Sequence, residues 1–218
     1  MRQVSVLGVT LRDLSVRESL REFRKYLNDG ACDAIGFVSH DMLLAASSSE
    51  ELRAALESYD MTIFSSPDLL QAAGISSRSR ERETESGLFL KGMLRELEKG
   101  KLRVFMVAGD EKQLEEVREI LSFAESTPEN IGEYVISGGA GEDDAVNEIN
   151  SFLPDVVFLK MDTEDGLRFI RENRVKINAR LMVSLGDTRG VMSAGPKKGL
   201  YGLLMRRLFR REAERYGQ

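Results

Sequence analysis

The chain alternates between short apolar runs and segments in which apolar residues recur every three or four positions. In its clearest run, 102–108, six of the seven residues are apolar, which predicts a strand buried on both faces. Gly109 ends this strand, and the acidic residues Asp110 and Glu111 begin a helix with one apolar face. A buried strand, a tight turn and an amphipathic helix form the repeating unit of a parallel α/β sheet. We therefore expect the rest of the chain to be built from further copies of this unit.

The same patterns divide most of the remaining sequence into strands and helices. Strands are predicted at 3–8, 34–38, 61–64, 133–136, 155–159 and 179–185, and helices at 16–27, 41–47, 52–58, 67–73, 88–97, 143–152, 167–171 and from 200 onward. Ser15 with Glu18, and Ser48 with Glu51, have the spacing of helix-capping pairs. Residues 74–86 contain one apolar side chain, which favours either a mobile loop or lid, or a solvated connector without a role.

This alternation predicts an α/β fold, a Rossmann-like parallel sheet flanked by helices, built either as one unit or as two lobes that meet at a cleft. We expect one α/β domain over residues 1–196 and a basic amphipathic C-terminal helix over 197–218. The tail holds seven Lys or Arg residues against two Glu, so it carries +5 while the preceding residues carry −10. Its apolar stripe with basic flanks suits an anionic membrane surface, and it suits equally a docked helix with a solvated basic face.

The composition excludes several classes of protein and site. A net charge of −5 argues against a nucleic-acid-binding protein. The single cysteine excludes an internal disulfide and a cysteine-cluster metal site, and the single histidine excludes most histidine-based ones, so we expect neither a metal nor another cofactor. No apolar run reaches the length of a membrane-spanning helix, and the N-terminus lacks the apolar core of a signal peptide. These features predict a cytoplasmic protein.

Polar residues and glycines follow the predicted strands, at the edge of an open α/β sheet where ligands bind. The candidates for a binding or catalytic site are Ser39, His40, Asp41, Ser65, Ser66, Asp68, Gly109, Lys160, Gly186 and Asp187. Because an imidazole in general titrates near neutrality, His40 is either a general base or a hydrogen-bonded surface residue. The aspartates are either general bases for a sugar hydroxyl or helix caps, and capping is favoured for Asp68 because it follows Pro67. The glycines within 137–141 lack the spacing of a phosphate-binding loop, which favours a plain loop.

Several stretches together are similar to one known family, and most of their residues belong to the scaffold. They are the opening 4–15, the segment 36–41, the helix 49–56, Tyr59 with Asp60, the strand 102–109, residues 148–150 with 154–157, and the tail through Arg215 and Tyr216. In this order, and over nearly the whole chain, they resemble the WecG/TagA/CpsF glycosyltransferases, glycosyltransferase family 26.

The resemblance implies an inverting enzyme that transfers an N-acetylmannosamine-type sugar from a UDP donor to a lipid-linked acceptor. Such enzymes form oligomers, act at the cytoplasmic face of the membrane, and supply teichoic acid, capsule or enterobacterial antigen. We therefore expect a UDP-sugar, a lipid-linked acceptor and an anionic membrane surface as partners, and a location that is cytoplasmic or peripheral at the inner face of the cell membrane. For such an enzyme, the acceptor side would be lined by Ser39, His40, Asp41 and Ser65, and the nucleotide side by Gly109, Lys160, Gly186 and Asp187.

The motifs that carry the family's chemistry are different in this chain. The Thr-x-Asn of the family is replaced by residues 39–41, its Gly-Thr-Asp by residues 85–87, and its Pro-Lys-Gln-Glu by residues 164–167. Its catalytic Asp-Gly after the third strand falls on Ser65 and Ser66.

A serine hydroxyl without an activating base stays protonated near pH 7, so Ser65 does not supply the proton acceptor of the family's aspartate. His40 and Asp68 are the candidates to replace it. Two hypotheses follow. The chain is a divergent glycosyltransferase, or it is a catalytically inactive relative that binds a nucleotide sugar or a partner protein as a regulator.

Overall fold

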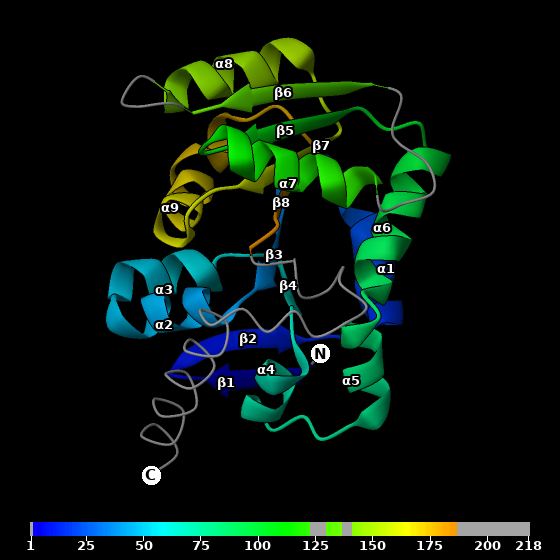
Figure 1. The fold of residues 1–218 in the computed structure, drawn as a ribbon, viewed down its shortest axis with the longest axis vertical. Coiled ribbons are helices and arrows are strands. Elements are labelled where there is room, and N and C mark those ends of the chain that lie inside the picture. Colours follow the sequence, from blue (N-terminus) through cyan, green and yellow to red (C-terminus); the bar gives the residue numbers. More distant parts are fainter. Residues whose placement is uncertain (1, 123–129, 137–140, 187–218) are drawn as a thin grey trace.

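A computed structural model of the chain describes residues 2–122, 130–136 and 141–186. In this part of the chain, six parallel strands form one continuous sheet in the order β4-β3-β8-β7-β5-β6 (Figure 1). Their bounds are β3 Asp33–Val38, β4 Met61–Phe64, β5 Val104–Ala108, β6 Ile131–Val135, β7 Val156–Lys160 and β8 Leu181–Ser184. The predicted parallel α/β sheet is therefore confirmed.

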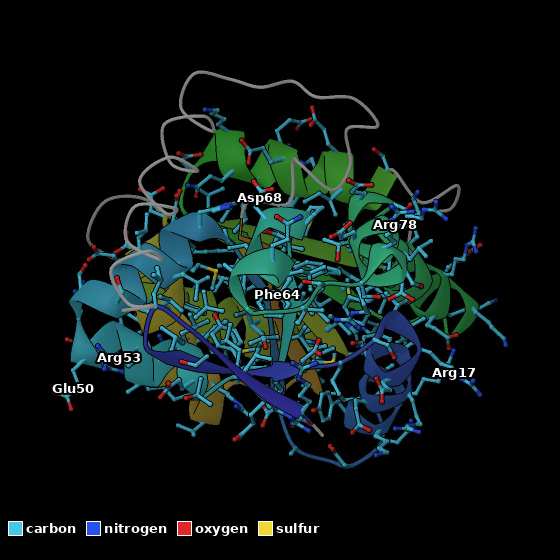
Figure 2. All side chains as sticks on the ribbon, turned by 90° about the horizontal axis from the view of Figure 1, so that it is seen from below. Arg17, Glu50, Arg53, Phe64, Asp68 and Arg78 are labelled. Carbon is cyan, nitrogen blue, oxygen red and sulfur yellow. The ribbon has the colours of Figure 1, made fainter. Side chains whose placement is uncertain are left out.

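Helices cover both faces of this sheet (Figure 1). Their bounds are α1 Val16–Tyr26, α2 His40–Ser48, α3 Glu50–Glu57, α4 Pro67–Ala72, α5 Arg78–Glu85, α6 Leu88–Lys99, α7 Glu111–Ser122, α8 Glu142–Phe152 and α9 Thr163–Asn173. A short 3-10 turn, η1, follows at Arg174–Lys176. Helices α1, α6 and α7 bury their apolar faces in one core, and α2, α3, α4, α8 and α9 bury theirs in the other. Charged side chains such as Arg17, Glu50 and Arg78 point outward from the periphery (Figure 2).

An N-terminal hairpin stands apart from the main sheet. Strand β1 (Arg2–Val6) pairs antiparallel with β2 (Val9–Asp13), so the strand predicted at 3–8 is confirmed over 3–6, and the second strand was not predicted. Leu7 and Gly8 form a two-residue turn in which both φ angles are positive, 52° and 77°. Leu7 adopts this unfavourable conformation while its side chain is only 4% exposed, so burial offsets the backbone strain. The hairpin lies beside the edge strand β4, where Thr62 Oγ1 donates a hydrogen bond to the carbonyl of Arg12 at 3.3 Å.

Three helix predictions need correction. Residues 78–85, predicted as part of a loop, form α5, because Ser77 caps the helix and Arg80 fastens it to the β2–α1 turn. The cap of α3 is Ser49 and not Ser48, since the Ser49 hydroxyl accepts a hydrogen bond from Leu52 N at 3.3 Å. The short helix predicted at 167–171 is longer, because α9 runs over 163–173. The capping box of Ser15 and Glu18 is confirmed.

A partly buried ionic cluster ties the last helical turn to the amino ends of β3 and β4. Arg174 lies 2.6 Å from an Asp60 carboxylate oxygen and 3.8 Å from one of Asp33, and its Nε donates to the carbonyl of Cys32. Burial, together with the negative charges of Asp60 and Asp29, raises the pKa of Asp33 to about 6. The ionised form of Asp33 is therefore disfavoured in the folded protein.

We expect Asp33→Asn to stabilise the protein at pH 8 and to have less effect at pH 5. Above pH 6 the Asp33 carboxylate is ionised in both states, and the folded state bears the cost of burying it. At pH 5 the carboxyl is largely protonated in the folded protein, so this cost is smaller, and it disappears below the unfolded pKa of 3.8. The melting temperature should rise by about 2–4 °C at pH 8. Asp143→Asn is the control, because the Asp143 side chain is 90% exposed. A loss of stability at pH 8 would contradict the prediction.

Candidate functional site

A polar cleft of about 300 Å³ lies at the carboxyl ends of the central strands, where parallel sheets bind ligands. Its side chains come from the segments that follow β3, β5, β7 and β8. The charged and amide residues that line it are Asp41, Asp110, Lys112, Gln113, Glu116, Lys160 and Asp162, with Ser39, Thr163, Ser184 and Gly186 between them. Hydrogen-bonding groups therefore dominate the wall of this cleft.

The wall next to β3 is fixed by the start of α2. Ser39 is the N-cap of this helix, and its hydroxyl accepts a hydrogen bond from Met42 N at 3.3 Å. The Ser39 side chain is thereby held in place with only 4% exposure. Asp41 lies in the first helical turn, where the helix dipole stabilises a carboxylate, and it lines the cleft.

The opposite wall is organised by Gln113, a residue that the sequence analysis did not single out. Its amide oxygen accepts a hydrogen bond from Gly109 N at 3.0 Å, and its amide nitrogen donates to Asp162 at 2.9 Å. Asp110 caps the first turn of α7 by accepting from Gln113 N at 2.7 Å. A Cβ atom on Gly109 would lie 2.7 Å from the Gln113 amide oxygen, so glycine allows this closed turn.

Lys160 supplies a buried positive charge at the centre of the cleft. It is the last residue of β7 and is 7% exposed. Its ammonium donates to the carbonyl of Gly186 and lies 3.5 Å from a Glu116 carboxylate oxygen. Among the described lining residues, the four carboxylates outnumber the two lysines. An anionic ligand would therefore depend on Lys160 and Lys112 and would compete with Glu116.

Gly186 connects the central strand β8 to the cleft. Its φ of +50° lies in the left-handed region that favours glycine. A Cβ at this position would be 2.4 Å from the carbonyl oxygen of Phe37, the neighbouring strand's penultimate residue. Only glycine fits this exit turn without moving β3 or β8.

The structure brings together part of the predicted site. Ser39, Asp41, Lys160 and Gly186 line the cleft, and Gly109 forms its β5–α7 turn. Asp187 lies outside the described residues. The glycines at 138 and 139 do so as well, so the expectation of a plain loop there has no structural outcome.

The three candidate catalytic residues and Ser66 are not among the described residues that line this cleft. Ser65 follows the edge strand β4, is 9% exposed, and donates its backbone N–H to Val38 O at 3.1 Å. His40 is the first residue of α2. Ser66 occupies the N-cap position of α4 without a side-chain hydrogen bond, and Asp68 lies in the first turn of that helix (Figure 2).

The described residues give no group of three histidine, cysteine or carboxylate side chains placed to hold a metal ion. Within the same residues, none of the helices is both long enough and apolar enough to cross a membrane.

The fold and the cleft define an α/β protein with an open parallel sheet and a polar ligand site at the carboxyl ends of its strands. Comparison with protein families identifies the family: residues 4–197 match the one described as "Glycosyl transferase WecG/TagA/CpsF family". The chain belongs to this family, as its resemblance predicted. Among curated proteins, the comparison finds no match.

We expect Gly186→Ala to destabilise the protein more than Gly30→Ala. Gly30 also has a positive φ, +81°, but nothing lies within 4 Å of the position that a Cβ would take there, so its variant incurs only the backbone strain. That strain should lower the melting temperature by about 2–4 °C. Gly186→Ala adds the clash with Phe37, which should cost about 1–3 kcal/mol more. Equal melting temperatures for the two variants would contradict the assigned geometry.

Proposed function

We propose that this protein binds a UDP-sugar in the polar cleft and transfers an N-acetylmannosamine-type sugar to a lipid-linked acceptor in cell-surface polysaccharide synthesis. The observation that carries the proposal is the cleft itself, because it gathers Ser39, Asp41, Lys160 and Gly186 at the carboxyl ends of β3, β7 and β8. Family membership supports glycosyl transfer in general. The UDP donor, the sugar and the acceptor come from the resemblance.

The charges of the cleft support a division of roles between its two walls. We assign to the nucleotide side the turns at Gly109 and Gly186 and Lys160, whose ammonium donates to the carbonyl of Gly186 and would also contact a phosphate oxygen. The acceptor side contains Ser39 and Asp41. A carboxylate that lines the cleft is suited to accept the proton of an attacking sugar hydroxyl, so Asp41 is the group that we assign to this step.

A specific observation favours a second function, binding without transfer. The position of the family's catalytic aspartate is occupied by Ser65, and neither Ser65, His40 nor Asp68 is among the described residues that line the cleft. Loss of a general base typically slows a reaction by about 10²–10⁴-fold. In this alternative the protein is a catalytically inactive relative that senses a nucleotide sugar or holds a partner protein.

We extend the proposal to the cell surface through the basic tail. Residues 197–218 carry seven Lys or Arg and two Glu, a charge that suits peripheral attachment to an anionic membrane. A docked helix with a solvated basic face is the alternative for the same residues. Assembly into a homo-oligomer is a further expectation from the resemblance.

Calorimetric titration of UDP and a UDP-sugar, paired with an assay for UDP release, tests the proposed function. Lys160→Gln should weaken binding of UDP by about tenfold or more, because it removes a charged hydrogen-bond donor. Glu116→Gln should strengthen binding, since it removes the carboxylate that competes for Lys160. Lys176→Ala is the control for a lysine outside the cleft.

The release assay separates the two functions. Turnover that disappears in Asp41→Asn while UDP binding remains supports the transferase. Binding without any turnover in the wild-type protein supports the inactive relative. Absence of UDP binding, or binding that is unchanged in Lys160→Gln, would refute the assignment of the cleft.

A further inference from the structure

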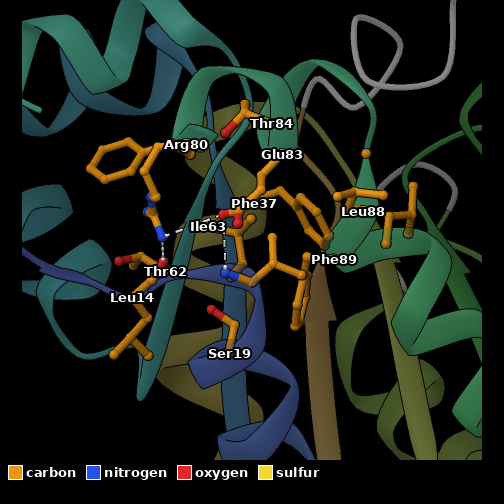
Figure 3. Close-up of a pocket in the computed structure, with 14 residues that line it drawn as sticks. Leu14, Ser19, Phe37, Thr62, Ile63, Arg80, Glu83, Thr84, Leu88 and Phe89 are labelled. Carbon is orange, nitrogen blue, oxygen red and sulfur yellow. Dashed lines mark hydrogen bonds and ion pairs between the residues drawn. The ribbon is translucent and has the colours of Figure 1, made fainter. Parts of the chain in front are cut away.

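A second cavity lies between α1, β4 and the turn that joins α5 to α6 (Figure 3). It shares no lining residue with the polar cleft. Its walls are largely apolar, with Leu14, Phe37, Ile63 and Phe89 facing the space. Its volume is about 30 Å³, whereas one water molecule requires about 10–15 Å³ measured in this way. The cavity therefore has room for two or three non-hydrogen atoms.

The charged groups that line this cavity are already engaged with each other and with the chain. Arg80 donates to the carbonyl of Leu14 and, at 2.8 Å, to the Asp13 carboxylate. Glu83 lies 3.9 Å from Arg80 and accepts a hydrogen bond from Val16 N at 3.4 Å. These contacts appear as dashed lines in Figure 3 where both residues are drawn. Because its charges are compensated internally, the cavity favours a neutral occupant.

Ser19 is the polar side chain at the floor of the cavity whose hydroxyl has no partner. The residue is 1% exposed, and its Oγ makes no hydrogen bond. In Figure 3 it rises from α1 with its hydroxyl pointing up into the cavity. A buried hydroxyl without a partner costs about 1–3 kcal/mol, so natural proteins rarely keep one unless another molecule satisfies it.

The polar and apolar groups that line the cavity indicate which kind of molecule it can bind. A buried water makes about three hydrogen bonds, whereas the hydroxyl proton of Thr62, the guanidinium of Arg80 and one Glu83 oxygen are engaged within the protein. A ligand group with one polar atom could bond to the Ser19 hydroxyl, and apolar carbon atoms around that atom would contact the apolar wall. Leu88 lines the same cavity and is 44% exposed, so the cavity reaches the surface along an apolar side chain.

We propose that this cavity binds a small neutral acyl group of the size of acetyl. Its carbonyl oxygen accepts a hydrogen bond from the Ser19 hydroxyl, and its alkyl carbon packs against Phe37 and Phe89. The rest of the ligand leaves the cavity past Leu88. The proposal does not rest on sugar transfer, because the cavity and the cleft are built from separate residues.

Titration of the ¹⁵N-labelled full-length protein with N-methylacetamide tests this site. The amide signals of Ser19 and Phe89 should shift, while those of Asp110 and Lys160 in the cleft should not. Ser19→Ala should weaken binding by about five- to tenfold, because it removes one neutral hydrogen bond. Ser122→Ala is the matched control, since Ser122 is an exposed helical serine whose hydroxyl donates to Glu119 O. Ser19→Val should abolish binding by filling the cavity.

The stability of the free protein gives an independent readout. Ser19→Ala should raise the melting temperature by about 2–4 °C, since it removes an unsatisfied buried hydroxyl. A lower melting temperature would overturn the proposal, because it would mean that Ser19 already has a partner, such as ordered water. Shifts confined to residues outside the cavity, or equal affinity in Ser19→Ala and Ser122→Ala, would overturn it as well. UDP binding at the cleft is measured separately, so failure of one site leaves the other testable.

Discussion

The insertion of β8 between β3 and β7 is the interaction on which the rest of the structure depends. On one side, β8 pairs with β3 from Asp33 to Gly36, and on the other it pairs with β7 from Val156 to Leu159. In the described chain, β3 and β4 have no strand pairing with β5, β6 and β7 except through β8. One four-residue strand thus joins the two halves of the sheet, and the cleft forms at its carboxyl end.

This arrangement explains why the site combines residues that are distant in sequence. Ser39 follows β3 and Lys160 ends β7, the two strands that flank β8, and Gly186 follows β8 itself. The carbonyl oxygen of Gly186 accepts a hydrogen bond from the ammonium of Lys160. Because Gly186 has no Cβ, the carbonyl of Phe37 can lie close to this turn. Gly186 therefore both lines the cleft and allows the close approach of β3 to the end of β8. Because carboxylates outnumber lysines in the cleft, binding of an anionic ligand would depend on Lys160 in either proposed function.

The sequence predicted the buried strands well, because apolar runs such as 102–108 have few alternative structures. It failed where local pattern and tertiary contacts disagree. The second hairpin strand was missed because Leu7 occupies a left-handed turn position that its residue type does not suggest. Helix α5 was missed because it has no buried residue and is held by Arg80 through contacts with a distant turn. Capping signals near its true ends, at Ser77 and Gly87, are the local evidence that was available.

The candidate site could be predicted only in part, for a similar reason. Strand ends are visible in the sequence, so Ser39, Asp41, Lys160 and Gly186 could be selected from it. The sequence does not show which strand ends are neighbours, and Ser65 follows the edge strand β4 while the cleft follows the central strands. Gln113 and Glu116 lie on a helix, where an amide and a carboxylate have the same local pattern as solvent-exposed residues. Their roles depend on Gly109 and Lys160, contacts that only the folded chain creates.

We place the proposed ligand site where β3, β8, β7 and β5 end, and not at the end of β4. Amide hydrogen exchange of the full chain, measured with and without a UDP-sugar, tests it most directly. Binding at the proposed site should slow exchange at 39–43, 109–116, 160–166 and 184–186 and leave 65–72 unchanged. Slower exchange confined to 65–72 would contradict it.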